Sequence, residues 1–178
     1  MRRKSNSKNI AMIVLMAIVA FGMLGVGSIF SRPQISAQQA DTNQAAVSTE
    51  RDATRNFALG CTLDMLAQFH ARLYLQIIIN GKNEVIPANI GITSGCTHPI
   101  STQDASGTIY VESPEQRDFT LGDFFAVWGK PFSSGEVLDY KADAGHEILM
   151  MVDGEPSGDY GNLVLRDGER IVIEYKGL

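Results

Sequence analysis

Four side chains in the middle third of the chain could bind a transition metal. These candidate ligands are His70, Cys96, His98 and Asp104. Cys96 and His98 form a Cys-x-His pair, in which a soft thiolate and an imidazole would suit copper or zinc. The simpler interpretation is that His98 is an ordinary loop histidine, and a metal-handling protein is the alternative.

Cys61 and Cys96 are the two cysteines of the chain. In an oxidising compartment an even pair predicts a disulfide, which would tie the entrance of the domain to the loop after its second strand. Free thiols and metal ligation are the alternatives, and a metal site would require a free thiolate. A thiol-redox protein is a further alternative, although the chain has no Cys-x-x-Cys motif.

Catalytic motifs are missing from the sequence, which contains no Gly-x-Ser-x-Gly, His-Glu-x-x-His or glycine-rich phosphate loop. Cys96 and His98 lack the third, orienting group that an activated nucleophile needs. Asp104 is better interpreted as a turn residue whose side chain accepts hydrogen bonds from backbone amides before Gly107. We therefore expect a protein without catalytic activity and without an obligatory cofactor.

The elements that would carry these residues begin with a membrane signal. Residues 10–31 are almost uninterruptedly apolar, and residues 1–9 contain four basic side chains. A helix of this length rises about 30 Å, the thickness of a bilayer's hydrocarbon core. The charges predict a single-pass anchor in the cell membrane, with a cytoplasmic N-terminus and an extracytoplasmic remainder. The alternative is a signal cleaved near Ala37, which would give a secreted protein.

The exported part divides into a polar segment and a domain. Residues 32–56 are mostly Gln, Ala, Ser, Thr and Asn, so they predict a flexible stalk. Residues 57–178 have the length of one domain. After residue 32 the chain carries 10 basic and 20 acidic residues, a net charge of −10. Such a surface repels phosphate, which argues against nucleic-acid binding and is compatible with cations or basic partners.

Strand and helix signals alternate along this domain. Asn80-Gly81 predicts a hairpin turn, and residues 120–129 predict a short helix that starts at a capping-box-like Thr120 and ends at Gly129. Leu121, Phe124, Phe125 and Trp128 would form its buried face. Strands are expected at residues 73–80, 84–86, 108–113, 147–152, 162–165 and 170–175, with an extended segment at 88–92 and a long loop at 93–107.

This element order predicts an α+β fold, a mixed sheet with one short helix on one face. A hairpin, a helix and a second strand pair follow the plan of the ubiquitin-like β-grasp fold. The segment Leu163-Val-Leu-Arg-Asp-Gly-Glu-Arg-Ile-Val-Ile resembles the closing strand of that superfold.

Residues 70–175 resemble an uncharacterised family of small exported or membrane-anchored prokaryotic domains. The matching segments are Ile78-Ile-Asn-Gly81, Ile86-Pro-Ala-Asn-Ile-Gly-Ile92, Cys96, Asp104-Ala-Ser-Gly107, Val111-Glu-Ser-Pro114 and Phe119-Thr-Leu-Gly-Asp-Phe-Phe-Ala-Val-Trp-Gly129. The resemblance implies a His-Thr-His-Asp stretch in the central loop and further histidines on both sides of it, a set that would suit a transition metal.

The chain departs from that pattern where the histidines are expected. Ser101-Thr-Gln-Asp104 replaces the His-Thr-His-Asp stretch, Tyr110 replaces one histidine, and Arg72 replaces another. The scaffold is kept and most candidate ligands are lost. We therefore expect a membrane-anchored, extracytoplasmic binding or assembly module with a protein partner in the cell envelope. β-Grasp domains bind partners at an exposed sheet edge or on an open sheet face.

Overall fold

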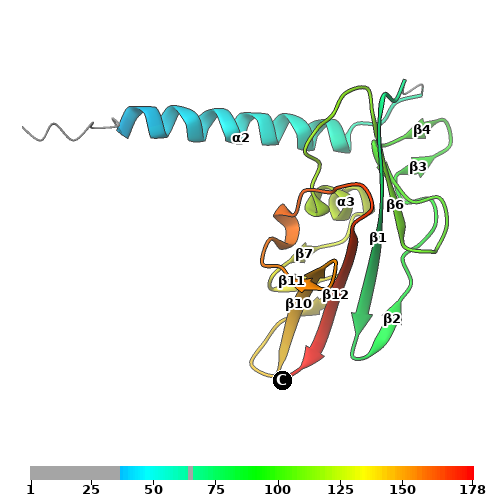
Figure 1. Ribbon diagram of the computed structural model, residues 1–178. Coiled ribbons are helices and arrows are strands. Elements are labelled where there is room, and N and C mark those ends of the chain that lie inside the picture. The colour runs from blue at the N-terminus through cyan, green and yellow to red at the C-terminus, as the bar shows by residue number, and fades with distance from the viewer. Residues whose placement is uncertain (1–36, 64–65) are drawn as a thin grey trace, which may run out of the picture. The chain divides into compact units, whose positions relative to one another are not determined.

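The computed structural model describes residues 37–63 and 66–178, and their side chains from residue 44 onward. The predicted α+β fold class is confirmed. The described residues are mostly sheet and contain two α-helices, where the sequence predicted one short helix (Figure 1). The predicted segments 1–9 and 10–31 lie outside the described residues. Within the described part of the chain, no helix is both long and apolar enough to cross a membrane.

The main sheet has the strand order β11-β10-β12-β1-β6-β5, and β2 pairs with the end of β1. The central strands β1 and β12 are the first and last long strands of the domain and run parallel to each other. β6 and β10 flank them in antiparallel orientation. The strands of this sheet are β1 (Phe69–Ile79), β2 (Lys82–Glu84), β5 (Ile100–Ser101), β6 (Thr108–Ser113), β10 (His146–Val152), β11 (Glu155–Pro156) and β12 (Arg170–Gly177).

Shorter elements complete the fold. β3 (Ile92–Thr93) and β4 (Cys96–Thr97) form a small hairpin, and β7 (Phe132–Ser133), β8 (Glu136–Val137) and β9 (Tyr140–Lys141) form a three-stranded sheet. The 3₁₀ helix η1 covers Tyr160–Asn162. A full strand at 162–165 was a wrong prediction, because there only Val164 pairs, in an isolated bridge to Thr120. The predicted hairpin at Asn80-Gly81 is confirmed by β1 and β2.

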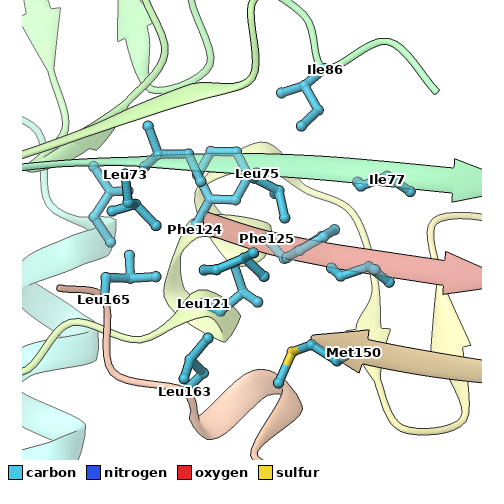
Figure 2. Close-up of a cluster of buried hydrophobic side chains, with 14 of the residues drawn as sticks. Leu73, Leu75, Ile77, Ile86, Leu121, Phe124, Phe125, Met150, Leu163 and Leu165 are labelled. Atoms are coloured by element: carbon cyan, nitrogen blue, oxygen red, sulfur yellow. The ribbon is translucent and has the colours of Figure 1, made fainter. Parts of the chain in front are cut away.

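The hydrophobic core lies on one face of the sheet, under the helix α3 (Leu121–Trp128) (Figure 2). Buried side chains of β1 alternate with exposed or half-buried ones, and Leu73, Leu75 and Ile77 point into the core. Leu121, Phe124 and Phe125 of α3 meet them. Alternation places every second side chain of a strand on the same face, so one face of these strands supplies the core.

Helix α3 (Leu121–Trp128) is built as the sequence predicts. Thr120 is its N-cap, Asp123 completes the capping box, and Gly129 ends the helix at φ 73°. The Asp123 Oδ2 accepts hydrogen bonds from the Thr120 amide at 2.9 Å and from the Thr120 hydroxyl at 3.0 Å. The amide and the hydroxyl of Thr120, at the start of this helix, therefore both have a hydrogen-bond partner inside the protein.

The expected flexible stalk differs from the structure, in which α2 (Ala37–Leu59) covers most of residues 32–56. Low hydrophobicity suggested a coil, yet Ala, Gln, Glu and Arg are good helix formers. Tertiary contacts hold the C-terminal end of the helix: Phe57 stacks on Phe119 with ring centroids 6.2 Å apart, and Arg55 pairs with Asp123 at 3.2 Å. The packed unit thus begins before residue 57, since residues 44–178 form one compact unit.

The predicted disulfide is present between Cys61 and Cys96, whose Cα atoms are 5.5 Å apart. It lies directly after α2 and joins that segment to β4. Beside it, Thr62 and Thr97 exchange two backbone hydrogen bonds of 3.1 and 3.2 Å. Covalent and hydrogen-bonded links therefore close the entrance of the domain at the same place.

Candidate interaction surface

The second face of the main sheet carries side chains that the core does not use. We call it the open face, because the side chains that β1, β6, β10 and β12 place on it are exposed or half-buried. The pairings among these four strands place 15 residues on it: His70, Arg72, Tyr74, Gln76 and Ile78 of β1; Thr108, Tyr110 and Glu112 of β6; Arg170, Val172, Glu174 and Lys176 of β12; and Glu147, Leu149 and Met151 of β10.

One half of the open face is polar and aromatic. The Arg170 guanidinium lies over the Tyr74 ring, 4.7 Å from its centroid. His70 Nδ1 lies 3.5 Å from a carboxylate oxygen of Glu112. Both contacts join neighbouring strands, so they also stabilise strand pairing.

The other half of the open face is mostly aliphatic. Ile78, Val172, Leu149 and Met151 come from three adjacent strands, and Glu174 lies between Ile78 and Leu149 in the pairing register. At its border Lys176 Nζ pairs with Glu147 at 3.6 Å. Contiguous apolar side chains on a surface are a mark of interaction sites.

The β10 edge of the sheet is closed to strand addition. Asp143 and His146 exchange backbone hydrogen bonds of 3.1 and 3.4 Å at its start. The Tyr160 hydroxyl donates to the Ile148 carbonyl at 3.0 Å, and the Ser157 amide donates to the Met150 carbonyl at 2.9 Å. β11 then covers the strand end with Pro156, whose nitrogen has no hydrogen to donate.

The opposite edge is closed as well. Ile100 and Ser101 pair with β6, and the Glu112 amide donates to the Pro99 carbonyl at 2.8 Å. β2 has only three residues and carries Lys82 and Glu84. Short, covered or charged edges prevent pairing with other chains. Of the two predicted binding modes, the geometry thus favours the open face over edge addition.

The predicted metal ligands do not gather at one place. His70 lies on the open face beside Glu112, while His98 Nδ1 lies 3.2 Å from the Ala58 carbonyl oxygen at the end of α2. Cys96 is bonded to Cys61. Among the described side chains, those of residues 44–63 and 66–178, no group of three or more His, Cys, Asp or Glu is arranged to hold a metal ion.

Asp104 behaves as the turn residue that the sequence predicts. Its Oδ1 accepts a hydrogen bond from the Ser106 amide at 2.9 Å. Hydrogen bonds from Ser106, first from its side chain and then from its amide, hold the pKa of Asp104 below its usual range. This carboxylate therefore stabilises the turn before Gly107.

Sequence reasoning missed a cluster at the β10 edge. The His146 ring stacks on Tyr175 at 5.0 Å, and its Nδ1 lies 2.9 Å from an Asp143 carboxylate oxygen. The contact with His146, followed by the Gly145 amide, lowers the pKa of Asp143. Burial, the Asp143 charge and Tyr140 raise the pKa of Tyr175. The Asp-x-x-His spacing is the signal in the sequence, because it fits a tight turn that enters a strand.

Comparisons with protein-family models, with curated proteins and with solved structures give no match. The resemblance to a family of exported domains therefore stays a prediction from the sequence.

Proposed function

We propose that this protein is a membrane-anchored, extracytoplasmic binding or assembly module that uses the open face to hold a protein partner. The observation that carries the proposal is the contrast between closed sheet edges and a face whose aliphatic and aromatic side chains are only half-buried. A sheet so arranged can be contacted on its face while self-propagating strand pairing is avoided.

The β-grasp assignment is part of this proposal. It is supported by the first and last long strands, β1 and β12, which are parallel in the centre of the sheet. β6 and β10 flank them, and α3 follows β6 in the chain and packs on one face. Domains of this plan bind partners at an exposed sheet edge or on the open sheet face.

The proposed location rests on the predicted anchor and on the disulfide. Structural disulfides persist in oxidising compartments outside the cytoplasm, and Cys61 and Cys96 form one. Thiol trapping of the full chain in intact cells tests this location, because an exported protein would show both cysteines oxidised. Carbonate extraction and an intact mass then separate the anchored form from a form cleaved near Ala37. Reduced thiols in a cytosolic fraction would contradict the location.

Site-specific photo-cross-linking of the full chain in its native membranes tests the partner. A benzophenone side chain would replace Leu149 or Tyr110 on the open face. The control position is Val85, which is 67% exposed and lies outside the open face. We expect a discrete cross-linked product from both open-face positions and none from Val85. Equal products from all three positions, or none from the open face, would contradict the proposed function.

A further inference from the structure

Glu174 is the charged residue at the centre of the aliphatic half of the open face. In the register it pairs with Leu149 on one side and with Ile78 on the other. Val172 and Lys176 are its same-face neighbours along β12, and Lys176 pairs with Glu147. Within residues 44–63 and 66–178, where side chains are described, Glu174 makes no ion pair and no side-chain hydrogen bond.

This arrangement does not suit an inorganic cation. Hard cations such as Ca²⁺ take six to eight oxygen ligands. Two other polar side chains on this face already bond to each other, because the Gln76 side-chain amide donates to the Asn83 side-chain carbonyl at 2.7 Å. One carboxylate between aliphatic side chains therefore offers too few ligands.

The same arrangement fits a cation carried on an apolar stem. The methylene groups of Arg and Lys side chains cover apolar surface while their charged ends reach outward. Such a stem would lie across Ile78 and Leu149 and bring its charge to Glu174. Desolvation by the surrounding aliphatic groups would strengthen that ion pair relative to a fully exposed one.

The charge of the chain supports a basic partner over a second copy. The part after residue 32 has a net charge of −10, so two copies repel each other and a basic surface is attracted. We infer that the open face binds a protein partner through an exposed Arg or Lys side chain flanked by apolar residues, with Glu174 as its counter-ion. This inference rests on the proposed function and names its partner class.

Methyl NMR on the full chain in detergent micelles, with labelled methionine methyl groups, tests the inference directly. Met151 reports on the open face and the buried Met150 on the core. The probe is the blocked tripeptide acetyl-Leu-Arg-Leu-amide. Its matched control carries citrulline, which has the shape of arginine without its charge. At low salt we expect the arginine probe to shift Met151 but not Met150, and to bind about fivefold more tightly than the citrulline probe.

Two variants assign the effect to Glu174. Glu174→Gln should remove the preference for arginine over citrulline. Glu84→Gln removes the same charge from an exposed residue of β2 and should leave the preference unchanged. Equal binding of both probes, no shift of Met151, or equal effects of the two variants would overturn the inference. A Met151 shift that depends on protein concentration without any probe would make a second copy the occupant and would also overturn it.

The two tests fail separately. Cross-linking from the open face without a preference for the arginine probe would keep the proposed function and remove this partner class. A lack of cross-linking would remove the proposed function, even if the probe bound.

Discussion

The two faces of the main sheet come from the same four strands and differ in what their side chains do. On the core face, Leu75, Ile77, Ile109 and Ile171 are almost completely buried. On the open face, neighbouring strands are linked by individual contacts such as Arg170 with Tyr74. Burial of apolar area is the main stabilising contribution to folding, whereas exposed pairs contribute little. The core face therefore contributes most of the stability of the sheet. Residues of the open face can be substituted to suit a partner at little cost in stability.

The largest effect that this comparison predicts is at Phe124, which is fully buried between α3 and the sheet. Phe124→Ala should lower the free energy of unfolding by about 3–5 kcal/mol, because it removes buried area and leaves a cavity. Leu149→Ala on the open face should cost about 1 kcal/mol or less. Urea unfolding of the full chain measures both values. Similar losses at the two positions would show that the faces do not differ as described.

The second effect concerns the entrance of the domain rather than either face. Replacing Cys61 and Cys96 together by Ser should lower the free energy of unfolding by about 4 kcal/mol, since the 35-residue separation closes a loop of moderate length. Hydrogen exchange should rise at the end of α2, near Phe57. Unchanged exchange there would mean that the contacts of Phe57 with Phe119 hold this end of α2 without the disulfide.

The third effect tests the buried polar contact between α2 and α3. Asp123, whose side chain is 5% exposed, accepts from Thr120 and pairs with Arg55. Asp123→Ala should cost about 2 kcal/mol, because it removes the Asp123 half of the capping box and leaves the Thr120 amide without a partner. Asp52→Ala is the matched control: Asp52 is exposed on α2, and its loss should change stability by less than about 0.5 kcal/mol. A loss at Asp52 as large as that at Asp123 would contradict this account.

Local signals explain which parts of this fold could be predicted from the sequence. Thr120 with Asp123, Gly129 and Asn80-Gly81 act through neighbouring backbone groups, and the structure confirms each of them. The helical end of α2 could not be predicted, because it depends on Phe119 and Asp123, which are distant in sequence. Tertiary contacts of this kind override local propensity.

On β1, the residues that belong to the open face could not be identified from the sequence either. Ile77, Ile78 and Ile79 are consecutive and equally apolar, so the pattern does not tell which of them faces the core. Only the pairing of Ile78 with Glu174 places it on the open face. The closed edges could not be predicted for a similar reason, because the Tyr160 hydroxyl reaches Ile148 from the 3₁₀ helix η1. The candidate metal ligands His70, Cys96, His98 and Asp104 lie on different strands and loops, whose arrangement in space could not be predicted from the sequence. They do not form a group that could hold a metal ion.

The smallest effect lies at the β10 edge, where the open face meets the core, and it depends on pH. The contact with His146 lowers the pKa of Asp143 from its ordinary value of 3.8. A carboxyl group whose pKa is lower in the folded state stabilises the fold above its unfolded pKa, and this stabilisation is lost as the pH falls through the folded pKa. Asp143→Asn should therefore lower the urea midpoint at pH 6, while the difference from the unmodified chain should be smaller at pH 3.

Asp118→Asn is the control for this last effect, because Asp118 is likewise exposed but makes no contact with the β10 edge. Its effect on the urea midpoint should be small at both pH values. If Asp143 holds the turn against β10, Asp143→Asn should also speed amide exchange at His146, whose amide bonds the Asp143 carbonyl. Unchanged exchange would mean that the backbone bridge closes this edge without the carboxylate. The protection against strand addition would then come from the Tyr160 and Ser157 contacts.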